Sequence, residues 1–155
     1  MVDFVGAGCG AKDLIPLRGL KLIQQADVII YAGSLVNPEL LEYAKPGCEI
    51  HNSALMTLDE VISVMSAAES AGRRIVRLHT GDPSLYGAIR EQMSRLDGLG
   101  ISYAVCPGVS SFCGAAAALR AEYTLPAVSQ TVIITRMAGR TPVPERESIE
   151  SLAEH

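Results

Sequence analysis

Short runs of aliphatic and β-branched residues alternate with longer amphipathic stretches through most of this chain. Strands are expected at 3–5, 27–31, 48–51, 74–79 and 102–106, and helices near 17–23, 37–46, 57–72, 89–96 and 114–119. This alternation is typical of a parallel sheet, because neighbouring parallel strands need long crossover connections that are usually helical. The sequence therefore predicts an α/β fold in which a parallel sheet is sandwiched by helices.

The ends of two expected helices carry local signals. Thr57 and Glu60 have the spacing of a capping box, and Gly72 is a suitable residue to end the helix that follows. Asn37 and Pro38 form an N-cap followed by proline at the first helical position. Helices are therefore expected to begin at these two places.

The composition of the chain narrows the classes of function. The 155 residues are 48% hydrophobic and 19% charged, which is typical of a compact fold and not of a disordered chain. Aromatic residues make up 5%, and the formal net charge is -4, so a nucleic-acid partner is not expected. No signal peptide or membrane-spanning run is recognisable. These features predict a cytoplasmic protein without a membrane partner.

The cysteines show no pattern of a disulfide framework or a zinc site. Cys9, Cys48, Cys106 and Cys113 include no Cys-x-x-Cys pair and no histidine at a matching spacing. We expect reduced thiols, no bound metal, and burial of Cys106 and Cys113 as small apolar groups.

The last thirty residues differ in pattern from the rest. A further apolar run at 131–135 predicts a strand, but 136–145 are rich in turn residues and have no periodicity, and a helix is expected only near Ser151. We therefore expect residues 1–125 to form an N-terminal α/β domain that carries the cofactor and substrate loops. Residues 126–155 are expected to be a linker and the first strand of a truncated second α/β domain.

Four of the expected strands end in loops that contain glycine or serine, at 6–10, 33–34, 80–84 and 107–111. The carboxyl ends of parallel strands lie at one edge of a sheet, where open α/β sheets bind ligands in a crevice. Glycine lets main-chain groups approach a ligand closely. The pattern predicts a site for a small molecule such as an adenine, ribose or amino-acid moiety, held largely by the main chain.

Two common nucleotide sites do not match these loops. Glycines stand at 6, 8 and 10, whereas the dinucleotide fingerprint requires its third glycine at the position of Ala11, and the second strand ends at Tyr31 without an acid. The chain also lacks a P-loop and a Gly-x-Ser-x-Gly elbow. A dinucleotide site and a serine hydrolase are therefore not favoured.

Several polar residues near the loops have structural explanations as well as functional ones. Asp82 is suited to a turn and a helix start, Ser110 and Ser111 to helix caps, and His79 to a packed, hydrogen-bonded core position rather than to a base. No nucleophile or acid–base pair is visible. Such a site suits a reaction whose cofactor supplies the electrophile, such as methyl transfer from a sulfonium.

Four segments in this order resemble the tetrapyrrole (corrin/porphyrin) methyltransferase family: Val5-Gly-Ala-Gly-Cys-Gly10, Tyr31-Ala-Gly-Ser-Leu-Val-Asn-Pro-Glu39, His79-Thr-Gly-Asp-Pro-Ser-Leu-Tyr-Gly87 and Pro107-Gly-Val-Ser-Ser-Phe112. The resemblance implies two α/β domains, S-adenosylmethionine in the cleft between them, and a homodimer. Within the family, the Ala-Gly-Ser-Leu-Val-Asn and Thr-Pro-Val-Pro segments are similar to members that methylate C-11 of precorrin-4 or cobalt-precorrin-4 in cobalamin biosynthesis.

The resemblance also implies a set of site residues. The cofactor would be contacted, mostly through the main chain, by Cys9, Thr80, Gly81, Asp82, Leu85, Ser110 and Ser111. No catalytic residue is assigned, and Asp82 and Tyr86 are candidates for assisting proton movement. The implied reaction is direct attack of the tetrapyrrole carbon on the sulfonium methyl group, which releases S-adenosylhomocysteine, and Arg90 or Arg120 is a candidate to meet substrate carboxylates.

The chain departs from the family pattern in two ways. The usual first loop, Gly-x-Gly-Pro-Gly-Asp, has Cys9 and Ala11 in place of its proline and acid. Family members are also longer by about a hundred residues, as a two-domain architecture requires. We therefore expect the 155 residues alone to bind S-adenosylmethionine weakly and not to turn over. A non-catalytic binding domain and a methyltransferase acting at another ring carbon are the alternatives.

Overall fold

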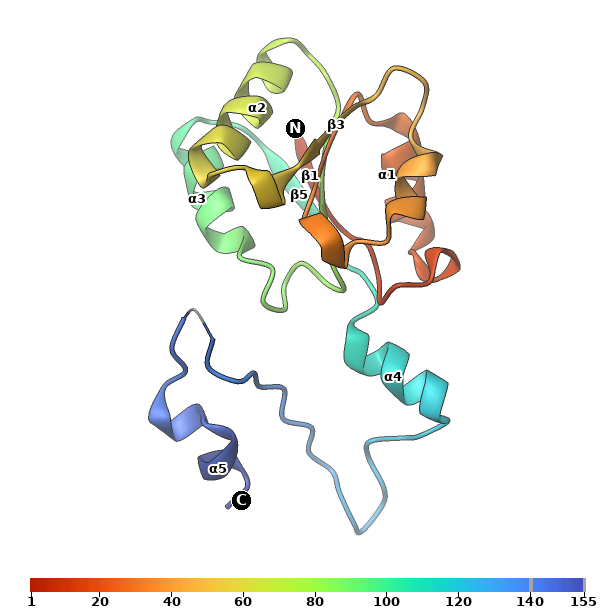
Figure 1. Ribbon diagram of the computed structural model, residues 1–155, viewed down its shortest axis with the longest axis vertical. Coiled ribbons are helices and arrows are strands. Elements are labelled where there is room, and N and C mark those ends of the chain that lie inside the picture. Colours follow the sequence, from red (N-terminus) through yellow and green to blue (C-terminus); the bar gives the residue numbers. More distant parts are fainter. Residues whose placement is uncertain (140, 155) are drawn as a thin grey trace. The chain divides into compact units, whose positions relative to one another are not determined.

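The computed structural model describes residues 1–139 and 141–154 (Figure 1). The chain divides into two compact units, Met1–Leu119 and Arg120–His155. The first unit contains the whole sheet and is described first. Whether 126–155 begin a second domain stays a prediction.

A five-stranded parallel sheet forms the centre of the first unit, which confirms the predicted α/β fold. The strands lie in the order β3-β2-β4-β1-β5. Gly6 pairs with His79, and Val5 pairs with Cys106, so β1, β4 and β5 end at nearly the same level. Their bounds are β1 Val2–Gly6, β2 Val28–Tyr31, β3 Glu49–Asn52, β4 Ile75–His79 and β5 Tyr103–Cys106.

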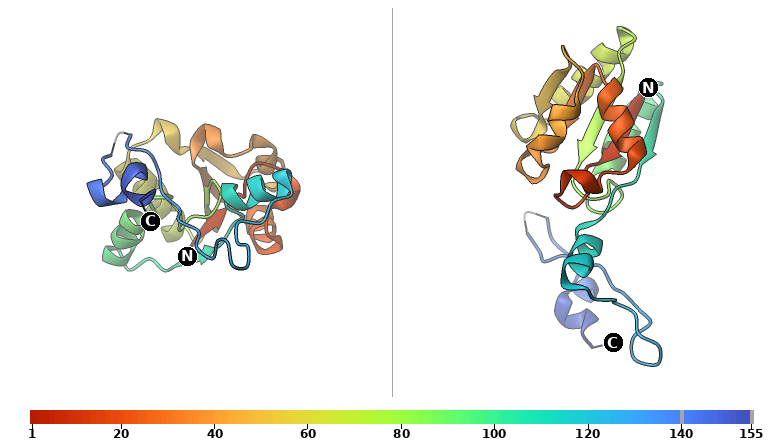
Figure 2. Two further views of the ribbon diagram at one scale, coloured as in Figure 1. Left: turned by 90° about the horizontal axis from the view of Figure 1, so that it is seen from below. Right: turned by 90° about the vertical axis from the view of Figure 1, so that its right-hand side faces the viewer.

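Helices cover both faces of the sheet (Figures 1 and 2). On one face, α1 (Leu17–Gln25) and the 3-10 helix η3 (Pro38–Tyr43) pack through Ile23 and Leu40. On the other face, α2 (Leu58–Ser70) and α3 (Ile89–Gly98) pack through Met65 and Leu96. After β1 the chain continues to α1 on the first face, and after the neighbouring β4 it continues to α3 on the second face. This reversal makes the carboxyl edge between β1 and β4 a ligand-binding position.

Local signals explain where two of these helices begin. The Thr57 side chain accepts a hydrogen bond from the Glu60 amide, and the Glu60 carboxylate accepts one from the Thr57 amide, which confirms the capping box of α2. Asn37 Oδ1 accepts a hydrogen bond from the Glu39 amide at the start of η3. Short 3-10 turns complete the connections: η1 Lys12–Leu14, η2 Gly33–Leu35 and η4 Ser53–Leu55.

Three expectations about local structure are wrong. Asp82 does not begin a helix, since α3 starts at Ile89 after Ala88, which adopts a left-handed conformation. Cys106 is buried as expected, but Cys113 is exposed. It lies on α4 (Ser111–Leu119), which has no buried residue. The run 131–135 is not a strand, since it has no strand partner within the described part of the chain.

In its described residues, 120–139 and 141–154, the second unit has two short helices, η5 (Glu145–Glu147) and α5 (Ile149–Leu152). The α5 helix lies where a helix was expected near Ser151, and Ser148 caps its first turn. Arg140, within the segment that carries part of the family resemblance, lies outside the described residues. None of the described helices is long and apolar enough to cross a membrane.

Candidate functional site

Three glycines pack against one another where β1, β4 and β5 end. A Cβ atom added at Gly6 would lie 2.5 Å from Gly108 Cα and 2.6 Å from the Gly81 carbonyl oxygen. A Cβ atom at Gly108 would lie 2.7 Å from Gly6 Cα. Real side chains do not tolerate such distances, so only glycine lets the three backbones approach this closely. We call residues 6–10, 80–82 and 107–111 the loop cluster.

Main-chain hydrogen bonds join the first two segments of the loop cluster. Gly8 and Gly81 form an antiparallel bridge, in which the Gly81 amide donates to the Gly8 carbonyl at 2.9 Å. The Ala7 amide also donates to the His79 carbonyl at 2.7 Å. Gly8 and Gly81 adopt positive φ angles of 81° and 57°, which favour glycine. The chain therefore fixes these two loops to each other without any ligand.

The Asp82 side chain connects the second segment to the third. Its Oδ2 accepts a hydrogen bond from the Gly108 amide at 3.0 Å, and its Oδ1 accepts one from the Ser84 amide at 2.8 Å. A carboxylate that accepts main-chain N–H groups on both oxygens is a strong structural bridge. Asp82 therefore has the structural role in a turn that was expected. It joins two loops, however, and does not begin a helix.

Asn37 is a contributor that the sequence analysis missed. Its Oδ1 caps η3 as expected, and its Nδ2 donates a hydrogen bond to the Gly10 carbonyl at 2.8 Å. The loop after β2 is thereby tied to the first glycine loop. The N-cap signal located Asn37, but nothing in the sequence pairs its second amide atom with Gly10.

The structure brings most of the expected cofactor residues together. Gly81 lies close to the third segment, because a Cβ atom there would be 3.7 Å from Ser110 Cα and 3.9 Å from the Ser111 nitrogen. Cys9 packs on α4, since a Cβ atom at Gly114 would lie 2.6 Å from Cys9 Sγ. Gly10 has a φ of 125° and no atoms around its Cβ position. The first glycine loop therefore has open space beside Gly10.

Leu85 and Tyr86 lie farther along the loop between β4 and α3. Their side chains are exposed, Tyr86 at 61%. Tyr86 and Ala88 have φ angles of 56° and 51°, in the left-handed region that costs non-glycine residues roughly 1–2 kcal/mol each. Gly87 sits between them with its α-carbon against Pro83, where a side chain would clash. Strain of this kind is often found at functional sites.

His79 ends β4 directly before the loop cluster. It is 3% exposed and packs against Phe4, with ring centroids 6.0 Å apart. Burial, with a smaller contribution from the Arg77 charge, lowers the pKa of His79 to about 3, so the ring is neutral. The expectation of a packed core histidine is correct, but its Nε2 has no hydrogen-bond partner among the described residues.

Two further charged candidates are exposed residues. Arg90 is exposed on α3, and Arg120 is exposed at the start of the second unit. Within residues 1–139 and 141–154, no group of three or more His, Cys, Asp or Glu side chains is placed to hold a metal ion.

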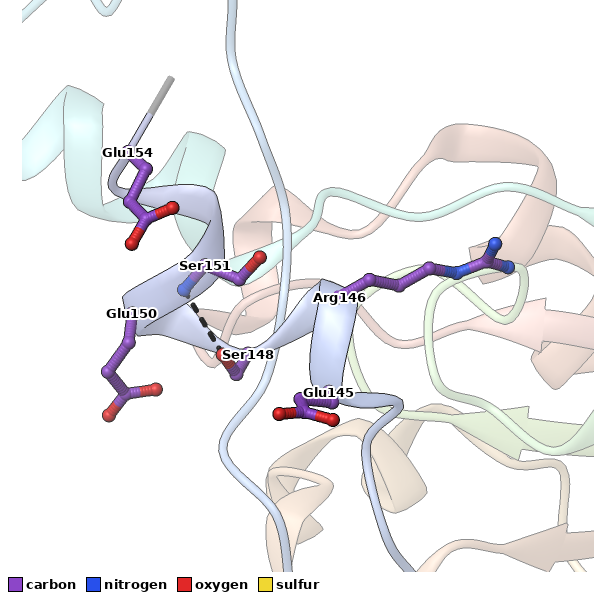
Figure 3. Close-up of a pocket in the computed structure, with 6 residues that line it drawn as sticks. All are labelled: Glu145, Arg146, Ser148, Glu150, Ser151 and Glu154. Carbon is purple, nitrogen blue, oxygen red and sulfur yellow. Dashed lines mark hydrogen bonds between the residues drawn. The ribbon is translucent and has the colours of Figure 1, made fainter.

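The second unit has a surface hollow of a different character (Figure 3). Its lining combines acidic and serine residues with one arginine, namely Glu145, Arg146, Ser148, Glu150, Ser151 and Glu154. Ser148 accepts the Ser151 amide as a helix cap, and Arg146 extends away from Glu150 and Glu154. The hollow is explained by the start of a short helix, and we assign it no function.

Comparisons with known proteins agree with this geometry. A family model described as Tetrapyrrole (Corrin/Porphyrin) Methylases matches residues 1–155. A cobalt-precorrin-4 C(11)-methyltransferase of Methanocaldococcus jannaschii is 58% identical over 154 residues, covering 99% of this chain and 60% of the relative. The X-ray structure of a cobalamin biosynthetic enzyme, cobalt precorrin-4 methyltransferase, matches with a TM-score of 0.96 at 50% identity, covering 99% of this chain and 64% of that one.

A more distant structure contains a ligand. A uroporphyrin-III C-methyltransferase of Thermus thermophilus, solved with S-adenosylhomocysteine, matches with a TM-score of 0.63 at 30% identity. The match covers 74% of this chain and 47% of that structure. This chain therefore spans less than two thirds of the length of each of these proteins.

Proposed function

This chain belongs to the tetrapyrrole (corrin/porphyrin) methylase family, and from that premise we propose that it carries the S-adenosylmethionine loops of a C-methyltransferase in cobalamin biosynthesis. The proposed reaction is methyl transfer to C-11 of cobalt-precorrin-4 or of precorrin-4. Two observations support the substrate and the donor: the name of the relative at 58% identity, and S-adenosylhomocysteine in the T. thermophilus structure.

The convergence of the loop cluster carries the proposal. Loops that follow three different strands are joined by the Gly8–Gly81 bridge and by the Asp82–Gly108 hydrogen bond. They lie at the carboxyl edge of the sheet, where the connections of β1 and β4 part to opposite faces. Such an edge, lined by main-chain groups and small side chains, suits the adenosine and amino-acid portions of the proposed donor.

Each part of the loop cluster has a proposed task. The residues proposed to contact the donor, mostly through the main chain, are Cys9, Thr80, Gly81, Asp82, Leu85, Ser110 and Ser111. Asp82 would act mainly by holding Gly108, because both of its oxygens accept main-chain amides. Tyr86 stays a candidate for assisting proton movement, since its side chain is exposed in the segment that follows residues 80–82.

The proposed methyl transfer requires few further groups from the protein. S-adenosylmethionine, when bound, supplies a sulfonium methyl group that is electrophilic without a protein nucleophile. The loops of this chain would align the reactants and exclude water, and alignment alone can lower a barrier by roughly 7–11 kcal/mol.

The relatives are longer than this chain, and we propose that their additional length completes the cofactor cleft. On this basis the 155 residues alone would bind the donor weakly and would not turn over. The homodimer and the cytoplasmic location stay predictions of the family resemblance. A non-catalytic binding domain, or methylation at another ring carbon, would be the alternative functions.

A methyl-transfer assay tests the proposal. This chain, joined to the C-terminal region of the M. jannaschii relative, is incubated with cobalt-precorrin-4 and methyl-13C S-adenosylmethionine. We expect one labelled methyl group at C-11 and release of S-adenosylhomocysteine. A label at another ring carbon would establish the other methyltransferase. Binding of S-adenosylhomocysteine without transfer to any tetrapyrrole of the series would indicate the non-catalytic domain.

A further inference from the structure

Two buried polar side chains lie one behind the other on β4, beneath α2 and α3. Arg77 is 7% exposed and His79 is 3% exposed, and both face the side of the sheet that carries Phe4 and Ile30. Burying polar groups is unfavourable unless each finds a partner. Of the side-chain nitrogens and oxygens described in the chain, His79 Nε2 is the one buried atom without a hydrogen bond.

Arg77 is a buried cation whose partners are neutral. Its Nε donates to Gln92 Oε1 at 3.0 Å, and one terminal nitrogen donates to the Ile30 carbonyl at 3.1 Å. None of the ion pairs in the described residues includes Arg77. Burial lowers its pKa to about 10, so the guanidinium stays charged at neutral pH. A buried charge without a counter-ion favours the approach of an anion.

His79 is better suited to donate a hydrogen bond than to accept a proton. A base works best with a pKa near the working pH, and the pKa of about 3 is far below it. A neutral imidazole has one N–H donor and one acceptor nitrogen. The charged Arg77 precedes His79 by two residues on the same strand. An N–H at His79 Nε2 would therefore favour a carboxylate over a neutral acceptor.

We propose that Arg77 and His79 form a carboxylate-anchoring pair, in which His79 Nε2 donates to a ligand carboxylate and the Arg77 charge stabilises it. The proposal rests on the proposed function, because both ligands of that function carry carboxylates. One source is an acid side chain of the tetrapyrrole, and the other is the amino-acid end of the methyl donor. His79 is thus a positioning residue for the ligand and not a base.

The segment that directly follows His79 in the chain is strained. It runs from Thr80 to Ala88 between β4 and α3, and its residues Tyr86 and Ala88 hold left-handed backbone. A rearrangement that relaxes these two residues recovers part of their strain. Opening of this segment is therefore less costly than opening of an unstrained loop.

Nitrogen-15 NMR of the histidine side chains tests the pair directly. The chain has three histidines, and His51 on β3 serves as the internal reference. The probes are uroporphyrin III, a tetrapyrrole with eight carboxylates; S-adenosylhomocysteine, which has one; and 5′-methylthioadenosine, which has none. We expect the His79 Nε2 resonance to shift with one of the first two probes, which identifies the source, and not with the third.

Two outcomes of this titration contradict the pair. A probe that binds with its carboxylate while the His79 resonance stays unchanged would overturn the pair and leave the proposed function intact. Failure of uroporphyrin III and S-adenosylhomocysteine to bind, both to this chain and to the form joined to the M. jannaschii C-terminal region, would overturn the proposed function and the pair with it.

Substitutions separate anchoring from packing. His79→Phe removes an unpartnered polar atom, so the fold should be as stable as the parent or more stable. We expect this substitution to weaken binding of the carboxylate probe that shifts the His79 resonance about tenfold, which corresponds to ~1.4 kcal/mol. Binding of 5′-methylthioadenosine should be unaffected. His79→Gln retains an N–H donor and should restore part of the affinity. Unchanged affinity in His79→Phe would contradict the proposal.

Discussion

At the scale of single residues, glycine 108 shows how close backbone approach shapes the candidate site. Its α-carbon lies against Gly6, and its amide donates to Asp82. The loops can converge only because no side chain separates them. Residue identity at this position therefore controls both the stability of the first unit and the geometry of the loop cluster.

We predict that Gly108→Ala destabilises the protein by about 2 kcal/mol, because the new methyl group overpacks against backbone. Gly98→Ala is the matched control, since its Cβ position at the end of α3 has no neighbours within 4 Å. The control should be neutral or stabilising by up to ~1 kcal/mol. Urea denaturation measures both, and equal stabilities of the two variants would contradict the packing of the three glycines.

His79 also predicts a pH dependence. Its pKa is about 3 in the folded protein and near 6.5 in the unfolded chain, so the unfolded state binds more protons between these values. The free energy of unfolding should be highest above pH 6.5 and should fall by up to ~1.4 kcal/mol per pH unit below it.

The window from pH 4.5 to 6.5 separates this effect from the titration of Glu49 and Glu60. Hydrogen bonds and charges lower the pKa values of Glu49 and Glu60 below the ordinary 4.5, so those groups lose their contribution at lower pH. His79→Phe should flatten the slope in this window, whereas His51→Gln should keep it. A slope that persists in His79→Phe would show that another group causes it.

At the scale of elements, the sequence predicted regular structure better than loop structure. The buried strands β2 and β4 were located because β-branched runs stand out, and α2 because Thr57 and Glu60 cap it. The turn before α3 was missed, since nothing in the sequence indicates left-handed backbone at Tyr86 and Ala88.

Long-range pairing explains the other differences. The order β3-β2-β4-β1-β5 depends on contacts between distant strands that periodicity does not encode. Strand pairing also explains why 131–135 is not a strand: its composition is strand-like, but it has no strand partner among the described residues. Convergence of the glycine loops was predictable, because parallel strands end at one edge, but the atoms that join them, such as Asp82 Oδ2 and Asn37 Nδ2, were not.

The Asp82 bridge is testable as a connection between β4 and β5. Asp82→Asn keeps one acceptor oxygen and replaces the other with an NH2 group, so only one of the Ser84 and Gly108 amides keeps its acceptor. We expect a loss of about 2 kcal/mol in unfolding free energy and weaker binding of S-adenosylhomocysteine. Asp13→Asn, on the exposed η1 turn, is the control. Unchanged stability and affinity in Asp82→Asn would show that the bridge is dispensable.

At the scale of the whole molecule, the first unit carries the sheet, both helical layers and the loop cluster. The family to which the chain belongs accounts for this arrangement, and the relatives at high identity are longer than the chain. We propose that the carboxyl edge of this sheet binds the methyl donor through main-chain groups of three loops.

Amide chemical-shift mapping with S-adenosylhomocysteine tests that claim most directly, because it detects weak binding residue by residue. We predict that the perturbed amides cluster at 7–10, 80–85 and 108–111, with Asp82→Asn reducing the response and Asp13→Asn preserving it. Perturbations confined to the amino edge of the sheet or to residues 120–154, or none at saturating ligand, would show that the carboxyl edge does not bind the donor.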